Sequence, residues 1–132
     1  MDGISSWFEY LSTRGDLVIE TLAQTLTYVV LVTISASIVA IVLGVATRHN
    51  PFAKELSLSI ASVFLTIPSL ALFTIFIPIV GLGFAPSFIA LFLYALLPIM
   101  RNTVAGLDSV DSSILESAKG MGLTSGQILL KV

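Results

Sequence analysis

The sequence predicts an all-α membrane protein with three transmembrane helices, followed by a polar segment of short helices. Of its 132 residues, 56% are hydrophobic and only 11% are charged, whereas soluble domains carry about 25% charged residues. Asp, Glu, Lys and Arg are absent from residues 21–47 and again from residues 56–100. Since a spanning helix needs roughly 20 mostly apolar residues, the first stretch holds one span and the second holds two.

A short helix that lies on the membrane surface is predicted over about residues 4–19. Trp7, Phe8 and Tyr10 occur in this segment, and aromatic residues of this kind settle at the boundary between lipid and water. The Arg-Gly-Asp triplet at residues 14–16 predicts a break in the segment.

The first span is predicted over about residues 21–47. It contains several small residues, a type that lets helices approach each other closely in lipid: Ser35, Ala36, Ser37, Ala40 and Gly44. The Asn-Pro pair at residues 50–51 then predicts a turn, with the basic residues Arg48 and Lys54 on either side. The single histidine, His49, has no partner nearby in the sequence, which favours a surface histidine over a ligand or a pH sensor.

The second span is predicted over about residues 56–80 and contains Pro68 near its middle. A proline inside a helix removes one backbone hydrogen bond, and in lipid the freed carbonyl must be satisfied by protein or water. Thr66 and Ser69 flank the proline and offer that polarity. Two interpretations remain open for this break: a segment that lines a cavity, and a simple packing kink. The third span is predicted over about residues 87–106, after a glycine-rich turn.

The distribution of basic residues sets the predicted orientation. The first 20 residues carry four acidic residues against one basic residue. Basic residues follow the first span (Arg48, Lys54), and others lie near the end of the third span and after it (Arg101, Lys119, Lys131). With three spans, we expect the N-terminus to lie outside the cell membrane and both basic segments to lie in the cytoplasm.

The polar segment after the third span predicts two short helices joined by a glycine corner. Two pairs of residues match a capping box, in which side chains satisfy free amides at a helix start: Ser113 with Glu116, and Thr124 with Gln127. Gly120 and Gly122 lie between these pairs, and glycine commonly ends a helix in a left-handed turn.

The spacing within this segment resembles the EAA loop of binding-protein-dependent ABC importer permeases. That pattern reads Glu-Ala-Ala, three residues, Gly, nine residues, and then Ile-x-Leu-Pro. Here Glu116, Ser117 and Ala118 are followed at those distances by Gly122 and Val132. Ser117 departs from the middle alanine, and Val132 stands for the isoleucine. Because the closing Leu-Pro would fall beyond Val132, we expect the chain to be truncated within this loop.

Further stretches are similar to the permease subunits of osmoprotectant importers, which carry glycine betaine, carnitine or choline: TIPSLALF, GLGFAPSFIALFLYALLPIMRNTVAGL and DSSILESAKGMG. The resemblance covers roughly residues 20–132. It implies a MetI-like helical fold, in which residues 1–132 form the N-terminal part of one transmembrane domain.

The resemblance also implies partners and functional residues. A coupling loop at about residues 111–132 would dock on a cytoplasmic ABC ATPase, through Glu116, Ser117, Ala118, Gly120 and Gly122. A second permease subunit, identical or paralogous, would complete the membrane dimer, and an extracytoplasmic solute-binding protein would deliver the solute. Thr66, Pro68 and Ser69 are the candidates for lining the translocation path.

Several chemistries are absent from the sequence. It has no phosphate-binding loop of the Walker type, no cysteine and one histidine, and no Asp, Glu, Lys or Arg in residues 21–47 or 56–100. We therefore expect no enzyme activity, no metal and no cofactor in this chain, with ATP and magnesium held by the partner ATPase, and no nucleic-acid partner.

Three other functions remain as alternatives. A permease for amino acids or another small solute would share the coupling loop. A three-span membrane scaffold would explain the hydropathy and the polar tail, but not the spacing of Glu116, Gly122 and Val132. A small oligomeric channel would need polar stripes along its spans, and only the first span offers any.

Overall fold

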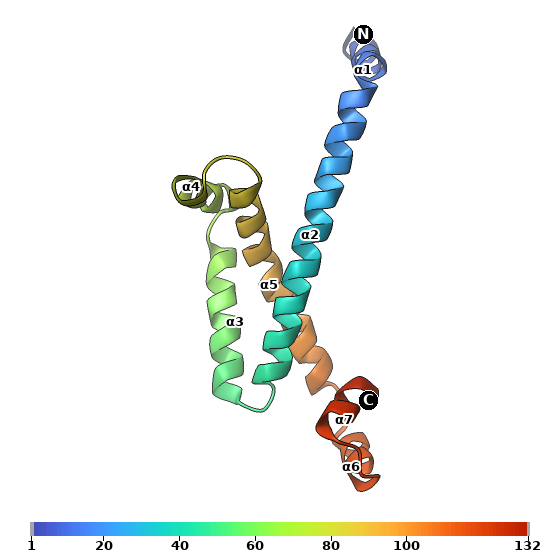
Figure 1. The fold of residues 1–132 in the computed structure, drawn as a ribbon, viewed down its shortest axis with the longest axis vertical. Helices are drawn as coiled ribbons and strands as arrows, with labels where there is room; N and C mark the ends of the chain where they lie inside the picture. The colour runs from blue at the N-terminus through green and yellow to red at the C-terminus, as the bar shows by residue number, and fades with distance from the viewer. Residues whose placement is uncertain (1, 132) are drawn as a thin grey trace.

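A computed structural model describes residues 2–131, and they form seven α-helices (Figure 1). In chain order these are α1 (Asp2–Thr13), α2 (Gly15–Thr47), α3 (Pro51–Thr66), α4 (Ser69–Val80), α5 (Phe84–Asp108), α6 (Ser112–Gly120) and α7 (Ser125–Lys131). The predicted all-α class is confirmed. Helices α2, α3 and α5 form a bundle, α4 lies at one end of it, and α6 and α7 lie at the other end.

The parallel pair of α2 and α5 is the centre of the packing. The ring of Tyr28 on α2 lies 4.3 Å from the ring of Phe84 at the start of α5, and Gly44 near the end of α2 faces Thr103 near the end of α5. The first contact lies earlier in both helices and the second lies later in both, so the two helices run in the same direction. The buried residues of α2 recur at every fourth position: Val32, Ala36, Ala40 and Gly44. Since residues four apart share one helix face, α2 buries a single narrow face.

Small side chains on that face allow the two helices to approach closely. Ala36 and Ala40 have 0% of their surface exposed. A Cβ added at Gly44 would lie 2.9 Å from Cγ2 of Thr103, which is closer than two carbon atoms can pack. Helix association in lipid depends on such van der Waals packing rather than on hydrophobic force. The role predicted for the small residues of the first span therefore fits the observed interface.

The stretch predicted as one second span, residues 56–80, is divided between two helices. Ile67 and Pro68 separate α3 from α4, and the two helices are bent by 96°. A proline disfavours helical backbone in the residue before it, and Ile67 is extended, with φ −81° and ψ 127°. The kink predicted at Pro68 is thus a sharp turn, and the straight part of this segment is the 16-residue α3, about 24 Å long.

The other predicted spans lie within longer helices. Among the described residues, α2 and α5 are long and apolar enough to cross a membrane, and α3 with α4 gives a third span only if the bent pair counts as one. The first predicted span, residues 21–47, ends with α2 but begins inside it. The third, residues 87–106, lies within α5. Gly81 and Gly83 form the turn before α5 with positive φ angles of 83° and 123°.

The segment predicted as one interfacial helix, residues 4–19, is divided between α1 and α2. The break predicted at the Arg-Gly-Asp triplet is confirmed, because α1 ends and α2 begins on either side of Arg14. Residues 15–19 therefore belong to the long helix α2. Trp7 and Phe8 are exposed on α1, and the side chain of Tyr10 lies outside the described residues. The location of α1 at a lipid surface stays a prediction.

The bundle end opposite α1 and α4 is called the loop end, and it comprises residues 48–50 and 108–131 (Figure 1). An ion pair crosses it: Nζ of Lys54 at the start of α3 lies 2.9 Å from Oδ2 of Asp108 at the end of α5. Both side chains are partly exposed, at 27% and 55%, and exposed pairs contribute about 1 kcal/mol or less. The pair therefore fixes the position of α3 against α5 more than it stabilises the fold.

Candidate functional site

The segment predicted to couple to an ATPase forms the two short helices α6 and α7 at the loop end. Two backbone hydrogen bonds close the end of α6: the amide of Leu123 donates to the carbonyl of Ala118 at 3.1 Å, and the amide of Gly122 donates to the carbonyl of Lys119 at 2.9 Å. This pair of bonds defines a Schellman motif, which requires a left-handed residue just after the helix cap. Gly122 occupies that position with a φ of 79°.

The two glycines at this corner have different roles. Gly120 is the last residue of α6, whereas Gly122 has the left-handed backbone. A Cβ added at either position would meet nothing within 4 Å. Gly122 is therefore required for its backbone conformation and not for space, since a left-handed conformation costs other residues roughly 1–2 kcal/mol.

The start of α6 differs from the prediction. Asp111 is the N-cap, and its carboxylate accepts a hydrogen bond of 2.8 Å from the amide of Ser113. Ser113 lies inside the first turn, where its carbonyl accepts a bond of 2.7 Å from the hydroxyl of Ser117. The predicted capping box of Ser113 with Glu116 is therefore wrong, because Asp111 takes the capping position two residues earlier and aspartate caps as well as serine.

Replacing Asp111 with alanine should fray the first turn of α6, with a defined pH dependence. The backbone amide of Ser113, followed by its hydroxyl, lowers the pKa of the Asp111 carboxyl below its ordinary value of 3.8. The stabilisation is therefore fully present above that value and is lost as the pH falls through the lower pKa of the folded state. Asp111→Asn keeps a capping oxygen but loses this pH dependence. Hydrogen exchange of the Ser113 amide measures the effect, and equal protection in wild type and Asp111→Ala would contradict it.

The capping box predicted at the start of α7 is confirmed. Oε1 of Gln127 accepts a hydrogen bond of 2.9 Å from the amide of Thr124, and the hydroxyl oxygen of Thr124 accepts one of 3.4 Å from the amide of Gln127. Two amides at the helix start are thus paired. Together with the turn at Gly122, this box fixes the direction in which α7 leaves the corner.

The predicted coupling residues are mostly at the surface. Four of the five are exposed: Glu116, Ser117, Gly120 and Gly122. Ala118 is buried, at 1% exposed, so it packs the corner and does not present a contact surface. Val132, the last position of the predicted pattern, lies outside the described residues. That this surface docks on an ATPase stays a prediction.

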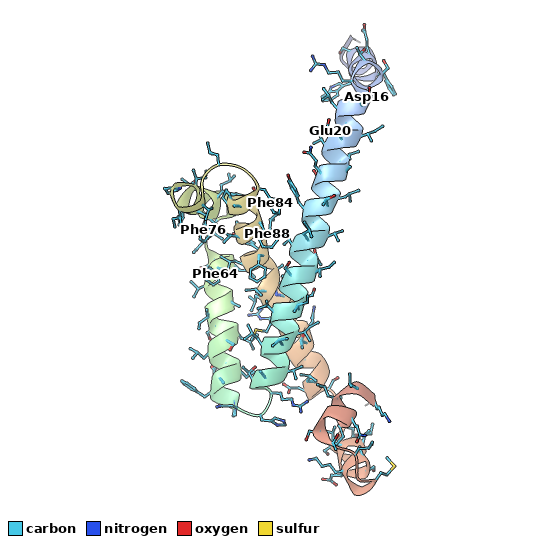
Figure 2. All side chains as sticks on the ribbon, viewed as in Figure 1. Asp16, Glu20, Phe64, Phe76, Phe84 and Phe88 are labelled. Carbon is cyan, nitrogen blue, oxygen red and sulfur yellow. The ribbon has the colours of Figure 1, made fainter. Side chains whose placement is uncertain are left out.

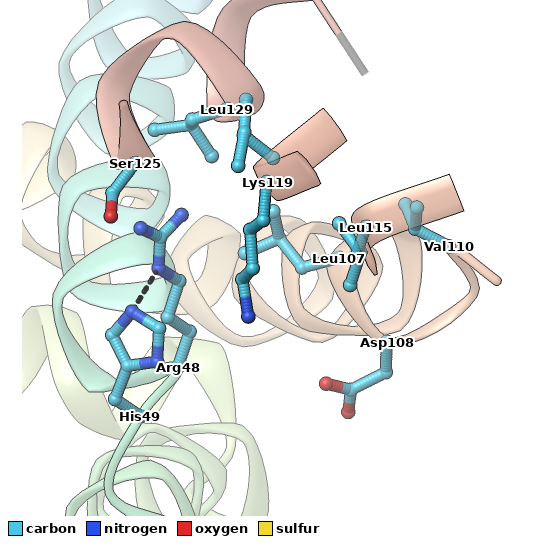
Figure 3. A pocket seen from close by; sticks show the side chains of 10 residues that line it. Arg48, His49, Leu107, Asp108, Val110, Leu115, Lys119, Ser125 and Leu129 are labelled. Carbon is cyan, nitrogen blue, oxygen red and sulfur yellow. Dashed lines mark hydrogen bonds between the residues drawn. The ribbon is translucent and has the colours of Figure 1, made fainter. Parts of the chain in front are cut away.

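A pocket of about 260 Å³ lies between this corner and the ends of the two long helices (Figure 3). Its apolar walls are Leu107, Val110, Leu115, Ile128 and Leu129, and its polar lining is Arg48, His49, Asp108, Lys119 and Ser125. Nε of Arg48 donates a hydrogen bond of 2.8 Å to Nε2 of His49. His49 is exposed and paired in this way, which agrees with the surface histidine favoured from the sequence.

The residues predicted to line a translocation path lie at the opposite end of the bundle. Thr66, Pro68 and Ser69 are exposed at the break between α3 and α4, and the length of α3, about 24 Å, separates them from the loop end. The hydroxyl of Thr66 donates to the carbonyl of Val63 within α3 at 2.7 Å, so it bonds inside its own helix. Figure 2 shows Phe64, Phe76, Phe84 and Phe88 gathered at the same end.

The break is held by Tyr94 of α5, a residue that the sequence reasoning missed. Its hydroxyl donates a hydrogen bond to the carbonyl of Ile67. Carbonyls at the end of a helix lack partners within that helix, and inside a bilayer protein must supply them. One signal was available, because Tyr94 is the single tyrosine in the uncharged stretch 56–100.

Replacing Tyr94 with phenylalanine should destabilise the protein by about 1–2 kcal/mol, since the Ile67 carbonyl would lose its partner. Tyr28→Phe is the matched control, because it keeps the ring that packs on Phe84 and should change stability little. Thermal unfolding in detergent measures both variants. Equal melting temperatures for the two variants would mean that the bond does not hold the break.

The chain matches one protein family over residues 36–132, a family described as binding-protein-dependent transport system inner membrane component. The matched part begins inside α2 and includes helices α3 to α7 and the glycine corner between α6 and α7.

Curated proteins that the chain is similar to are transport permeases. Carnitine transport permease protein OpuCB of Listeria monocytogenes is 43% identical over 94 residues, which is 71% of this chain and 43% of the relative. Carnitine transport permease protein OpuCD of the same organism is 37% identical over 129 residues, 98% of this chain and 58% of the relative. Choline transport system permease protein OpuBB of Bacillus subtilis is 34% identical over 119 residues, 90% and 55% respectively.

The chain spans about half the length of the curated relatives that it matches. No solved structure matches it.

Proposed function

The chain belongs to the family of binding-protein-dependent transport system inner membrane components, and we propose that it supplies membrane helices and the coupling loop of the permease of an ATP-driven osmoprotectant importer. Its place in a membrane follows from the family and from the long apolar helices α2 and α5. The proposed substrates are quaternary amines. The names of its relatives support this class, because they specify carnitine, choline and glycine betaine, all of which carry a quaternary ammonium group.

The observation that carries this proposal is the corner between α6 and α7. Glu116, Ala118 and Gly122 have the spacing of the EAA loop, and Gly122 has the left-handed backbone that closes α6. A stiff, exposed corner on a membrane protein suits docking into a groove of a partner. We infer that the partner is a cytoplasmic ABC ATPase, which holds ATP and magnesium, and that this chain is not itself an enzyme.

The experiment is solute uptake by the whole permease together with its ATPase and solute-binding protein, in cells that lack other osmoprotectant importers. We expect ATP-dependent uptake of labelled choline, carnitine or glycine betaine, with mutual competition and no competition by an amino acid. Uptake of an amino acid alone would favour the alternative permease function. An assembled complex that takes up none of these solutes would leave the quaternary-amine proposal wrong.

The proposed orientation places α1 outside the cell and the loop end in the cytoplasm. The basic residues near the loop end support it, against the single basic residue among the first 20: Arg48 and Lys54 after α2, Arg101 in the second half of α5, and Lys119 and Lys131 after it. The chain has no cysteine, so single cysteines can be introduced without background from this segment. We expect a membrane-impermeant maleimide to label Thr13→Cys in intact cells and to label Ser109→Cys only after permeabilisation. The reverse pattern would contradict the orientation and the cytoplasmic docking together.

The proposed translocation path runs past the break between α3 and α4. Thr66, Pro68 and Ser69 lie there, at the same end of the bundle as α1, where an extracytoplasmic solute-binding protein would deliver its solute. A second permease subunit would form the other wall of the path. Movement between two rigid-body states, driven by the ATPase through the corner, is the mode of transport that this arrangement suits.

A further inference from the structure

The pocket at the loop end lies near the boundary between the uncharged part of the bundle and its first charged residues. Arg48 is the first charged residue after the stretch 21–47, and Arg101 is the first after the stretch 56–100. Gly44 and Thr103 are in contact and the two helices are parallel, so Arg101 lies about 3 Å before that contact and Arg48 about 6 Å beyond it, nearer the loop end. Arg48 therefore marks the level at which the pocket begins. The headgroup region on each side of a bilayer is about 5–7 Å thick. The pocket, which begins at Arg48 and Leu107, therefore lies at headgroup depth.

The charge inside the pocket is positive. Arg48 and Lys119 reach it from α2 and α6, and Figure 3 shows both side chains directed into the same space. The carboxylate of Asp108 is already paired with Lys54 at 2.9 Å. Over residues 2–131, the structure gives the side chain of Lys119 no hydrogen bond or ion pair, and the one side-chain hydrogen bond of Arg48 goes from Nε to Nε2 of His49. Two cationic groups are thus left to meet an anion.

The remaining walls of the pocket are apolar. Leu107 at the end of α5, Leu115 on α6 and Leu129 on α7 face the same space as the two cations. Apolar side chains make no favourable contact with a small soluble anion. A phospholipid, in contrast, has a charged phosphate next to apolar chains. The volume of about 260 Å³ is just below the roughly 300–1,000 Å³ of sites that enclose small molecules. The pocket therefore fits a headgroup and not a whole lipid.

We propose that this pocket binds the headgroup of an anionic phospholipid, with Arg48 and Lys119 holding the phosphate and the leucines contacting the adjoining carbons. Basic pockets between membrane helices are typical sites for anionic headgroups. Because Lys119 belongs to α6 and Arg48 ends α2, a bound lipid ties the corner to the membrane surface. The charge of the leaflet then influences how the corner is held, independently of the solute that is carried.

The test measures retained lipid on the whole permease after exchange into bilayers of phosphatidylcholine with or without phosphatidylglycerol. Native mass spectrometry counts the phosphatidylglycerol molecules that stay bound. The variant is Arg48→Gln with Lys119→Gln. The matched control is Arg101→Gln with Lys131→Gln, which removes two basic residues from outside the pocket. Each basic group near an anionic surface contributes about a five-fold gain in binding, so the pocket variant should hold phosphatidylglycerol roughly 25-fold more weakly than the control.

Equal retention by the two double variants would overturn the proposal. Loss of phosphatidylglycerol on adding inorganic phosphate, but not on adding chloride at equal ionic strength, would identify a site for free phosphate and would also overturn it. A pocket variant that keeps its lipid but loses its ATPase would identify an ATPase contact instead. Arg48→Lys with Lys119→Arg should retain lipid, which separates loss of charge from misfolding. Since the readout is bound lipid, the result does not depend on the proposed transport function.

Discussion

Replacing Gly44 with leucine should separate α2 from α5 and destabilise the protein by about 3 kcal/mol or more. Even a single Cβ at this position would lie 2.9 Å from Cγ2 and 3.3 Å from Cβ of Thr103. Thr103 has little freedom to move aside, because its hydroxyl donates to the carbonyl of Ile99 at 2.9 Å. Leucine places three further carbons in the same gap. Unfolding by heat or by added denaturing detergent measures the loss.

Smaller changes at the same crossing separate the clash from a general effect of removing glycine. Gly44→Ala should destabilise by about 1–3 kcal/mol, and adding Thr103→Ser, which removes Cγ2, should recover most of that loss. Gly106 on α5 has nothing within 4 Å of an added Cβ. Gly106→Ala should therefore stabilise by about 0.5–1 kcal/mol, because glycine inside a helix is unfavourable. A gain of the same size in Gly44→Ala would show that the two helices do not approach closely there.

On the proposed function, replacing Gly122 with valine should open the corner and reduce ATP hydrolysis by the partner ATPase about ten-fold in the assembled importer. A left-handed backbone costs a residue with a Cβ roughly 1–2 kcal/mol, and a β-branched residue adopts it rarely. Both bonds of the Schellman motif depend on this backbone, including the one between Leu123 and Ala118. A free-energy change of about 1.4 kcal/mol corresponds to ten-fold in population. The measurement is ATP hydrolysis by the reconstituted complex, stimulated by the loaded binding protein.

Gly120→Val is the matched control for this prediction. It lies two residues earlier, ends α6 without a left-handed backbone, and meets open space on adding a Cβ. We expect coupled hydrolysis to change by less than about two-fold, since valine is no less favourable than glycine inside a helix. Equal losses in both variants would mean that exposed surface at the corner, and not the backbone of Gly122, governs coupling.

The helices could be predicted from the sequence because long stretches without charged residues, in a chain this apolar, are typical of membrane helices. Their bounds were less accurate where short polar motifs decide them. Asn50 caps α3 with its side chain, accepting from the amide of Ala53 at 3.2 Å, and Pro51 begins the helix. The helix therefore starts five residues before the predicted second span. The position of Pro51 in the first turn, where a missing amide costs nothing, was the signal for this start.

The bend at Pro68 could be located from the sequence but its size could not. Proline removes a backbone bond and nothing in its neighbours sets the angle that follows. The helices meet at 96° where a tertiary contact is present, the hydrogen bond from the Tyr94 hydroxyl to the carbonyl of Ile67. These two residues are far apart in the chain. The same reasoning applies to the start of α6. Asp111, Ser112 and Ser113 are all good caps, and spacing alone does not rank them.

In the candidate site too, features set by local sequence could be predicted and features set by tertiary contacts could not. The glycine corner followed from local spacing, since Gly122 and the pair Thr124 and Gln127 act on their own helix ends. The pocket did not, because its two cations, Arg48 and Lys119, are brought together only by the packing of α2 on α5. Contacts across such distances in sequence leave no pattern in a single chain.

The length of α2 has a consequence for how the protein stands in its bilayer. Its 33 residues make a rod of about 50 Å, while a bilayer with both headgroup layers measures about 40–45 Å. If α1 rests on the outer surface as predicted, and Arg48 lies at the inner headgroups, α2 must tilt by roughly 25–35°. Since α2 contacts α5 from Tyr28 to Gly44, only the part of α2 before Tyr28 is free, and that part acts as a lever. A thicker membrane decreases the tilt of α2 and moves α1 toward the bundle axis. The position of α1 therefore depends on membrane thickness.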